Sequence, residues 1–190
     1  MPMPDLRRIF CAAAAALLLP VAVHAQATVP IDPSPDGVPQ MVDSAAPEGW
    51  QPDPKAAQAM RQAIDAFLAL RDKGDRTGSY AMLTSRTRAN MAAEYWMEGV
   101  SLRGPLKERA IRQYSWYLDP AGAAEPGLYL AADFVGSYAD APVYCGYVMA
   151  HRARDGKIGI ARIEENVVLK EEADRAGKDG VKRMIAQMPC

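Results

Sequence analysis

Alternating apolar and polar positions between Gly127 and Leu169 give the clearest structural signal in the chain. This stretch holds three apolar, β-prone runs separated by two groups of turn-forming residues, which predicts a three-stranded antiparallel meander. The second turn, Asp155-Gly156, favours a tight hairpin because glycine tolerates a positive φ. The apolar parity of the last run changes near Arg162, and this change indicates a β-bulge.

Apolar residues with helical spacing precede the meander. They recur at steps of three and four from 53 to 74, which predicts a long helix with one apolar face and with Pro54 in its first turn. A short second helix is expected near Tyr80. A third helix is expected from Thr84 to Gly99.

The remaining elements complete a predicted α+β fold. Alternation of period two returns from Lys107 to Leu118 and predicts a strand before the meander. Residues 170–190 are polar and helix-prone, and form either a tail helix or a frayed chain. We therefore predict three N-terminal helices packed on a curved, cone-like, four-stranded antiparallel sheet, followed by a C-terminal tail helix.

The first 25 residues have the pattern of a secretory signal peptide. Arg7 and Arg8 precede an apolar run too short to span a bilayer stably, and small residues allow cleavage after Ala25 or Ala27. Six prolines follow before position 53, which disfavours a helix or a central strand and predicts a disordered linker. The predicted segments are a signal peptide (1–25), a Pro-rich linker (26–52), an α+β domain (53–169) and a helical tail (170–190). The protein is expected in the periplasm or outside the cell.

Charge and histidine content exclude several classes of function. The formal net charge of −1 gives no basis for nucleic-acid binding, and no later segment is long and apolar enough to cross a membrane. Cleavage removes His24 and leaves His151 alone, which excludes a zinc site built on paired histidines. His151 is expected at a solvated strand end. No phosphate-binding glycine loop, dinucleotide fingerprint or metal-spaced carboxylate motif is present, so we predict no catalytic residue, metal or cofactor.

Two cysteines remain after the leader. In an exported protein, Cys145 and Cys190 can form a disulfide that ties the tail to the sheet. Alternatively, Cys145 has the inward parity of its strand and is a buried free thiol.

Charged and aromatic residues in the predicted strands indicate where a ligand could bind. In the simplest interpretation the charged ones lie on a solvated face of the sheet. If the sheet curls, they instead line an apolar cavity with a few polar groups, which is the usual form of a small-ligand site. The candidate pocket residues are Glu108, Arg112, Trp116, Tyr144, Tyr147 and Arg162.

Short motifs in residues 55–169 carry a resemblance to a known family. They are Trp96, Arg103-Gly104-Pro105 with Arg109, Pro126-Gly127-Leu128-Tyr129, and Asp155-Gly156. They resemble an exported bacterial domain of unknown function, number four-zero-one-nine, or a sister family of it. The order of elements is similar to the cone-shaped nuclear-transport-factor-two-like superfamily. This resemblance implies a curled sheet around a long helix and carries no established activity.

Three functions are compatible with this sequence. The favoured one is an exported, non-enzymatic, single-domain module that binds an unknown small ligand or an envelope protein. The alternative is a small-molecule isomerase or hydratase with general acid/base residues inside the cone, which requires a desolvated carboxylate with a tyrosine in hydrogen-bond reach. A subunit of an envelope assembly is the third, and the sequence does not define the oligomeric state.

Overall fold

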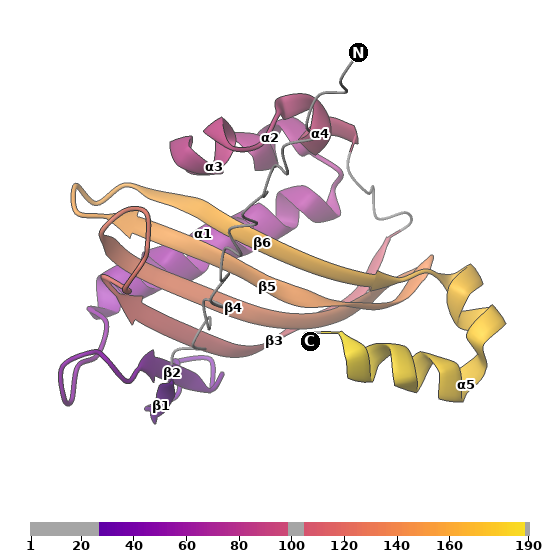
Figure 1. The fold of residues 1–190 in the computed structure, drawn as a ribbon, viewed down its shortest axis with the longest axis horizontal. Coiled ribbons are helices and arrows are strands. Elements are labelled where there is room, and N and C mark those ends of the chain that lie inside the picture. Colours follow the sequence, from indigo (N-terminus) through magenta and orange to yellow (C-terminus); the bar gives the residue numbers. More distant parts are fainter. Residues whose placement is uncertain (1–26, 99–104, 189–190) are drawn as a thin grey trace, which may run out of the picture.

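A long helix lies along one face of a six-stranded sheet in the computed structural model, which describes residues 27–98 and 105–188 (Figure 1). The strands are β1 (Thr28–Ile31), β2 (Gln40–Asp43), β3 (Leu106–Leu118), β4 (Gly127–Tyr138), β5 (Ala141–Ala153) and β6 (Ile158–Val168). The helices are α1 (Pro54–Asp72), α2 (Arg76–Ala81), α3 (Ser85–Ala89), α4 (Ala93–Glu98) and α5 (Lys170–Gln187). The strands lie in chain order across the sheet.

The predicted four-stranded antiparallel sheet with three N-terminal helices is wrong. Residues expected to form a disordered linker supply β1 and β2, and β2 pairs in parallel with β3, so the sheet is mixed. Helices α1–α4 therefore follow the first two strands. The proline content gave a wrong prediction for two reasons. Pro30 lies in the edge strand β1, where a missing backbone N–H donor is tolerated, and β2 contains no proline.

A buried hydrogen bond helps to attach β2 to the sheet. The Trp116 indole on β3 donates to the Gln40 side-chain oxygen at 2.9 Å, and the Gln40 amide donates to the carbonyl of Asp32 at 2.8 Å. Trp116 is fully buried, and Gln40 is buried beside it. A polar tether of this kind satisfies an indole N–H that would otherwise be desolvated without a partner.

The predicted strand at 107–118 and the predicted meander correspond to β3–β6. The Asp155-Gly156 turn joins β5 to β6 as expected. The bulge expected near Arg162 is confirmed, because Ala150 pairs with Ile160 whereas Met149 pairs with Arg162, which leaves Ala161 as the extra residue.

Helix α1 begins where the sequence predicts and supplies much of the core. The Asp53 side chain accepts the backbone N–H of Ala56 at 2.8 Å and so caps the helix. Its apolar face packs on alternate residues of β3–β6 in one cluster. The largest buried members of this cluster are Met60, Ile64, Phe67, Leu68, Trp116, Leu130, Phe134, Tyr138, Tyr144, Val148 and Ile160.

The predicted third helix consists of two short helices. Thr84, which caps α3, donates its backbone N–H to the carbonyl of Ile160 at 2.9 Å and so fixes the start of α3 against β6. The chain bends after Asn90, the C-cap of α3, and α4 then places Trp96 against Phe67. The Trp96 indole donates to the carbonyl of Arg76 at 3.1 Å. Contacts with the sheet and with α2 thus interrupt a segment that local propensity favours as one helix.

The tail is helical and bent. Gly177 has φ 66° and ψ 177° inside α5, which divides the helix into two arms. The predicted signal peptide, as well as Arg103, Gly104 and Cys190, lies outside the described residues. Within the described ranges, no helix combines the length and apolarity that a membrane crossing needs.

Candidate functional site

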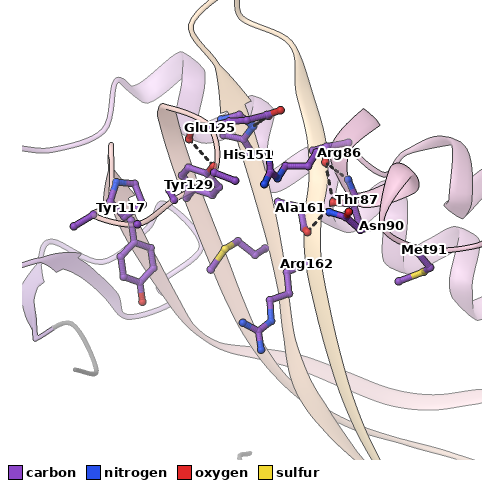
Figure 2. Close-up of a pocket in the computed structure, with 17 residues that line it drawn as sticks. Arg86, Thr87, Asn90, Met91, Tyr117, Glu125, Tyr129, His151, Ala161 and Arg162 are labelled. Carbon is purple, nitrogen blue, oxygen red and sulfur yellow. Dashed lines mark hydrogen bonds and ion pairs between the residues drawn. The ribbon is translucent and has the colours of Figure 1, made fainter. Parts of the chain in front are cut away.

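A hollow of about 840 Å³ opens on the face of the sheet opposite α1, and we refer to it as the outer-face hollow (Figure 2). Its floor is formed by Tyr117, Tyr129 and Met149, which alternate with the core residues of their strands and so point away from α1. Helix α3 forms one wall, and the β3–β4 loop forms the other.

The bulge in β6 holds the α3 wall in place. Because Ala161 is the bulged residue, its carbonyl is free to accept the Thr87 hydroxyl, at 2.8 Å. The Thr84 and Thr87 hydroxyls lie 2.8 Å apart and share a hydrogen bond. These contacts position Asn90 and Met91 at the border of the outer-face hollow.

The opposite wall depends on two unusual backbone positions. Asp119 has φ 44°, and its carboxylate accepts the backbone N–H of Gly127 at 2.6 Å, which closes the base of the loop. Gly127 has φ 146°, and a Cβ there would lie 2.6 Å from Nε2 of His151 and 2.5 Å from the carbonyl oxygen of Arg152. Only glycine therefore lets the loop approach His151 this closely.

His151 is buried, contrary to the expected solvated strand end, because the β3–β4 loop covers it. The residue is 3 % exposed, and its ring stacks on Tyr129 with the centroids 4.4 Å apart. Its Nδ1 lies 3.5 Å from a carboxylate oxygen of Glu125, and its Nε2 lies 3.2 Å from the carbonyl of Pro126. Both ring nitrogens thus face an oxygen, and neither is available to a ligand.

Tyr129 is also committed to the loop. Its hydroxyl donates to the carbonyl of Glu125 at 2.7 Å. Burial raises the pKa of Tyr129, and the Glu125 carboxylate raises it further, whereas the Arg86 guanidinium lowers it. Tyr129 is therefore neutral at physiological pH.

Two arginines border the outer-face hollow. Figure 2 shows the Arg86 side chain reaching from α3 toward Tyr129. Among the described residues, Arg86 makes no side-chain hydrogen bond or ion pair. Arg162 lies over the Tyr147 ring at 5.5 Å and 3.2 Å from a carboxylate oxygen of Glu164. The outer-face hollow therefore combines an aromatic floor with one unpaired and one paired cation.

The structure separates most of the predicted pocket residues. Trp116 and Tyr144 are core residues on the α1 face of the sheet. Glu108 and Arg112 are exposed on β3. Tyr147 and Arg162 meet on the outer face, and Arg162 is the one predicted residue that lines the outer-face hollow.

The sequence reasoning missed Arg86, Glu125, Tyr129 and the buried state of His151. One available signal was the Pro126-Gly127-Leu128-Tyr129 step, since a glycine before a strand indicates a close backbone approach. The contact of α3 with β6 has no such local signal.

A second polar cluster lies inside the protein, where the end of α1 meets the sheet. The Tyr138 hydroxyl donates to a carboxylate oxygen of Asp72 at 2.7 Å, and Arg109 contacts the same oxygen at 2.6 Å. Burial and the adjacent Asp72 carboxylate raise the pKa of Tyr138. Asp72 therefore links α1 to β3 and β4.

The second half of this cluster links α1 to β5 and β6. The Tyr144 hydroxyl donates to Glu165 at 2.7 Å, and Arg71 contacts the other carboxylate oxygen at 2.7 Å. Arg71 also lies over the Trp96 ring at 4.9 Å. The outer-face hollow is lined by none of these residues. We call Arg71, Asp72, Arg109, Tyr138, Tyr144 and Glu165 the α1 anchor.

Asp133 is a half-buried carboxylate on the outer face. It lies between Gln113 and Tyr147 on the neighbouring strands and has no hydrogen-bond partner among the described residues. Burial raises its pKa.

Neither a metal site nor the predicted disulfide partner is seen in the described part of the chain. No group of histidine, cysteine and acidic side chains there is arranged to hold a metal ion.

Cys145 is buried and disulfide-bonded, so the buried free thiol is excluded. Because Cys190 lies outside the described residues, its pairing with Cys145 stays a prediction.

A family model described as "Protein of unknown function (DUF4019)" matches residues 63–161. This match spans more than half of the chain, which therefore belongs to the DUF4019 family. The predicted family is thus confirmed, whereas the wider superfamily stays a prediction. No curated protein and no solved structure matches the chain.

Proposed function

We propose that this DUF4019 protein is an exported, non-enzymatic module that binds a small apolar ligand with one negative charge in the outer-face hollow. Export, the ligand and the absence of catalysis are parts of one proposal, and each has its own support.

The observation that carries the proposal is the combination of the hollow's volume and lining. A space of about 840 Å³ is of the size that small-molecule sites occupy. Tyr117, Tyr129 and Met149 offer a floor on which an apolar or aromatic body packs. The unpaired Arg86 guanidinium offers two parallel N–H donors to a carboxylate or sulfonate.

The engagement of the polar groups favours binding over catalysis. His151 has oxygen atoms at both ring nitrogens, and the Tyr129 hydroxyl donates to the backbone, so neither is free to move a proton to or from a ligand. The isomerase or hydratase alternative places its acid/base residues inside the cone, where the tyrosine–carboxylate pairs are those of the α1 anchor. There, Asp72 and Glu165 each contact a tyrosine and an arginine of the protein itself, so both carboxylates are engaged in contacts that join elements of the fold. Asp133, the half-buried carboxylate beside Tyr147, lies on the outer face and does not line the outer-face hollow.

Export is supported by the leader pattern and by the chemistry of Cys145. A basic pair followed by a short apolar run and small residues is typical of a cleaved signal. A disulfide at Cys145 fits an oxidising compartment, since reducing conditions keep most cytosolic thiols free. Cell fractionation should place the processed protein in the periplasmic or secreted fraction. An unprocessed cytosolic chain would contradict this part.

The ligand part is tested with 8-anilinonaphthalene-1-sulfonate, an aromatic sulfonate whose fluorescence rises on apolar surfaces. We expect saturable binding of one molecule per chain to the purified protein, and at least a fivefold weaker affinity for Arg86→Gln. Arg175→Gln, an exposed charge on α5, is the matched control and should bind as the wild type does. Equal affinities for wild type and Arg86→Gln would refute the proposed site. Circular dichroism and urea unfolding must show that both variants are folded.

A further inference from the structure

A second hollow, of about 670 Å³, lies between α5 and the end of the sheet where β3 and β5 begin. One face of α5 lines it, at positions that recur every three or four residues. From α5 these are Lys170, Ala173, Asp174, Gly177, Lys178, Val181 and Lys182. The opposite side is formed by Lys107, Ala139 and Pro142. We call this space the lysine hollow.

The face that α5 turns toward the sheet has an unusual composition for a packed helix. A helix that docks on a sheet normally presents a stripe of large apolar residues. Here the stripe carries three lysines, and its uncharged members, such as Ala173 and Gly177, are mostly small. Across α5, only Gly180 is buried. The helix therefore stands off from the sheet instead of filling the space between them.

The bend at Gly177 shapes this hollow. Its φ of 66° lies in the left-handed region, which glycine adopts readily and which is unfavourable for residues with a side chain. Because the two arms of α5 meet at this bend, Lys170 on the first arm and Lys178 and Lys182 on the second line the same space.

The charges in the lysine hollow are not balanced. Four lysines line it together with a single carboxylate, Asp174, whose oxygen lies 2.6 Å from the ammonium of Lys170. Among the described residues, Lys107, Lys178 and Lys182 make no ion pair. Three lysines thus line one concave space without an ion-pair partner among the described residues.

We infer that the lysine hollow is a binding site for a phosphate monoester. Such a group carries a charge of about −1.5 to −2 at neutral pH and three acceptor oxygens, which matches several separate ammonium donors. A single carboxylate would neutralise only one of them. The apolar residues Ala139, Pro142 and Val181 would face the carbon body of the ligand. This site lies apart from the outer-face hollow, shares no lining residue with it, and does not rest on the proposed function.

The test is calorimetric titration of the full protein with glycerol 3-phosphate, a soluble phosphate monoester. We expect saturable binding that weakens as salt rises, because ions screen the lysines. The double variant Lys178→Gln/Lys182→Gln should bind at least tenfold more weakly. The matched control, Arg175→Gln/Arg183→Gln, removes two charges of the same helix that do not line the hollow and should bind as the wild type does.

A second arm distinguishes a soluble ligand from a lipid. Flotation with phosphatidylcholine vesicles that contain one tenth phosphatidic acid presents the same phosphate monoester at a surface. Vesicle binding that the Lys178→Gln/Lys182→Gln variant loses and the control keeps supports the site with a lipid headgroup as its source. Absence of binding to both probes, or an equal loss in the two double variants, would overturn the inference.

Discussion

Replacing Tyr144 with phenylalanine tests whether the tyrosine–carboxylate hydrogen bond between β5 and β6 in the α1 anchor stabilises the fold. Tyr144 is 1 % exposed, and its hydroxyl donates to Glu165 at 2.7 Å. Phenylalanine keeps the ring, so its tilted contact with Phe134 and its edge contact with Tyr138 remain. The substitution therefore removes one hydrogen bond and leaves no new cavity of the size that destabilises a core.

The expected cost follows from the charge on the acceptor. Hydrogen bonds to charged groups contribute about 1.5–3 kcal/mol to the free energy of unfolding. Glu165 keeps its contact with Arg71 in the variant and is not left alone, which favours the lower end of this range. We expect a loss of about 2 kcal/mol, or about 4–8 °C in Tm for a domain of this size.

Urea unfolding followed by tryptophan fluorescence measures this loss. Tyr95→Phe is the control, because Tyr95 is 72 % exposed and should change the free energy of unfolding by less than about 0.5 kcal/mol. If Tyr144→Phe matches the wild type within that margin, the Tyr144–Glu165 bond does not stabilise the fold. A double-mutant cycle with Glu165→Gln should show a coupling of at least about 1 kcal/mol.

Two further predictions concern pH. Burial, followed by the Asp36 and Asp65 charges, raises the pKa of the Tyr114 hydroxyl in the folded protein to about 12. The folded state thus favours the neutral hydroxyl. This contribution to the free energy of unfolding is complete below pH 10 and is lost as the pH rises toward 12. Tyr114→Phe should remove up to about 2.7 kcal/mol of this loss of stability at alkaline pH. Urea unfolding midpoints between pH 9 and 12 measure the effect. If the midpoints of the two proteins fall in parallel with pH, the result contradicts this prediction. Burial raises the pKa of Asp133, so its ionised form weakens the fold at neutral pH and its protonated form does not below pH 4. Asp133→Asn should therefore be more stable by about 1 kcal/mol at pH 7, with the gain shrinking in acid, and a less stable variant at pH 7 would contradict the assignment.

The periodicity of apolar residues predicted α1 and β3–β6, because the buried face of each of these elements follows from its own sequence. The alternation in β3–β6 reports one buried and one less buried face, and the spacing in α1 reports a single buried stripe. It failed for β1 and β2. Four-residue strands give too few alternations, and the parallel pairing of Gln40–Val42 with Tyr114–Trp116 is a contact between distant segments. The prolines around these strands are compatible with an edge position, which composition does not reveal.

The candidate site could not be predicted for a related reason. Each wall of the outer-face hollow is fixed by a contact between segments far apart in the chain, such as Thr87 with Ala161. The burial of His151 likewise depends on Glu125 and Pro126 in the β3–β4 loop, which strand β4 separates from His151 along the chain. The inward parity predicted for Cys145 in β5 is wrong, because Tyr144 and Val148 carry the opposite parity and pack in the core with α1. His151 shares the parity of Cys145 and so lies on the outer face, where the β3–β4 loop covers it.

The two proposed sites differ in how much of each lies within the residues that the family model matches. Residues 63–161 include Arg86, the β3–β4 loop and His151, and they supply every lining residue of the outer-face hollow except Arg162. The match does not extend to α5, which supplies most of the lysine hollow. A site built from the matched region is expected to recur wherever the same residues stand in other DUF4019 chains. The lysine hollow is instead expected only in chains that carry, after the last strand, a bent helix with lysines at the positions of Lys170, Lys178 and Lys182. The two sites should therefore vary independently among family members, because they share no lining residue and α5 contributes only to the lysine hollow.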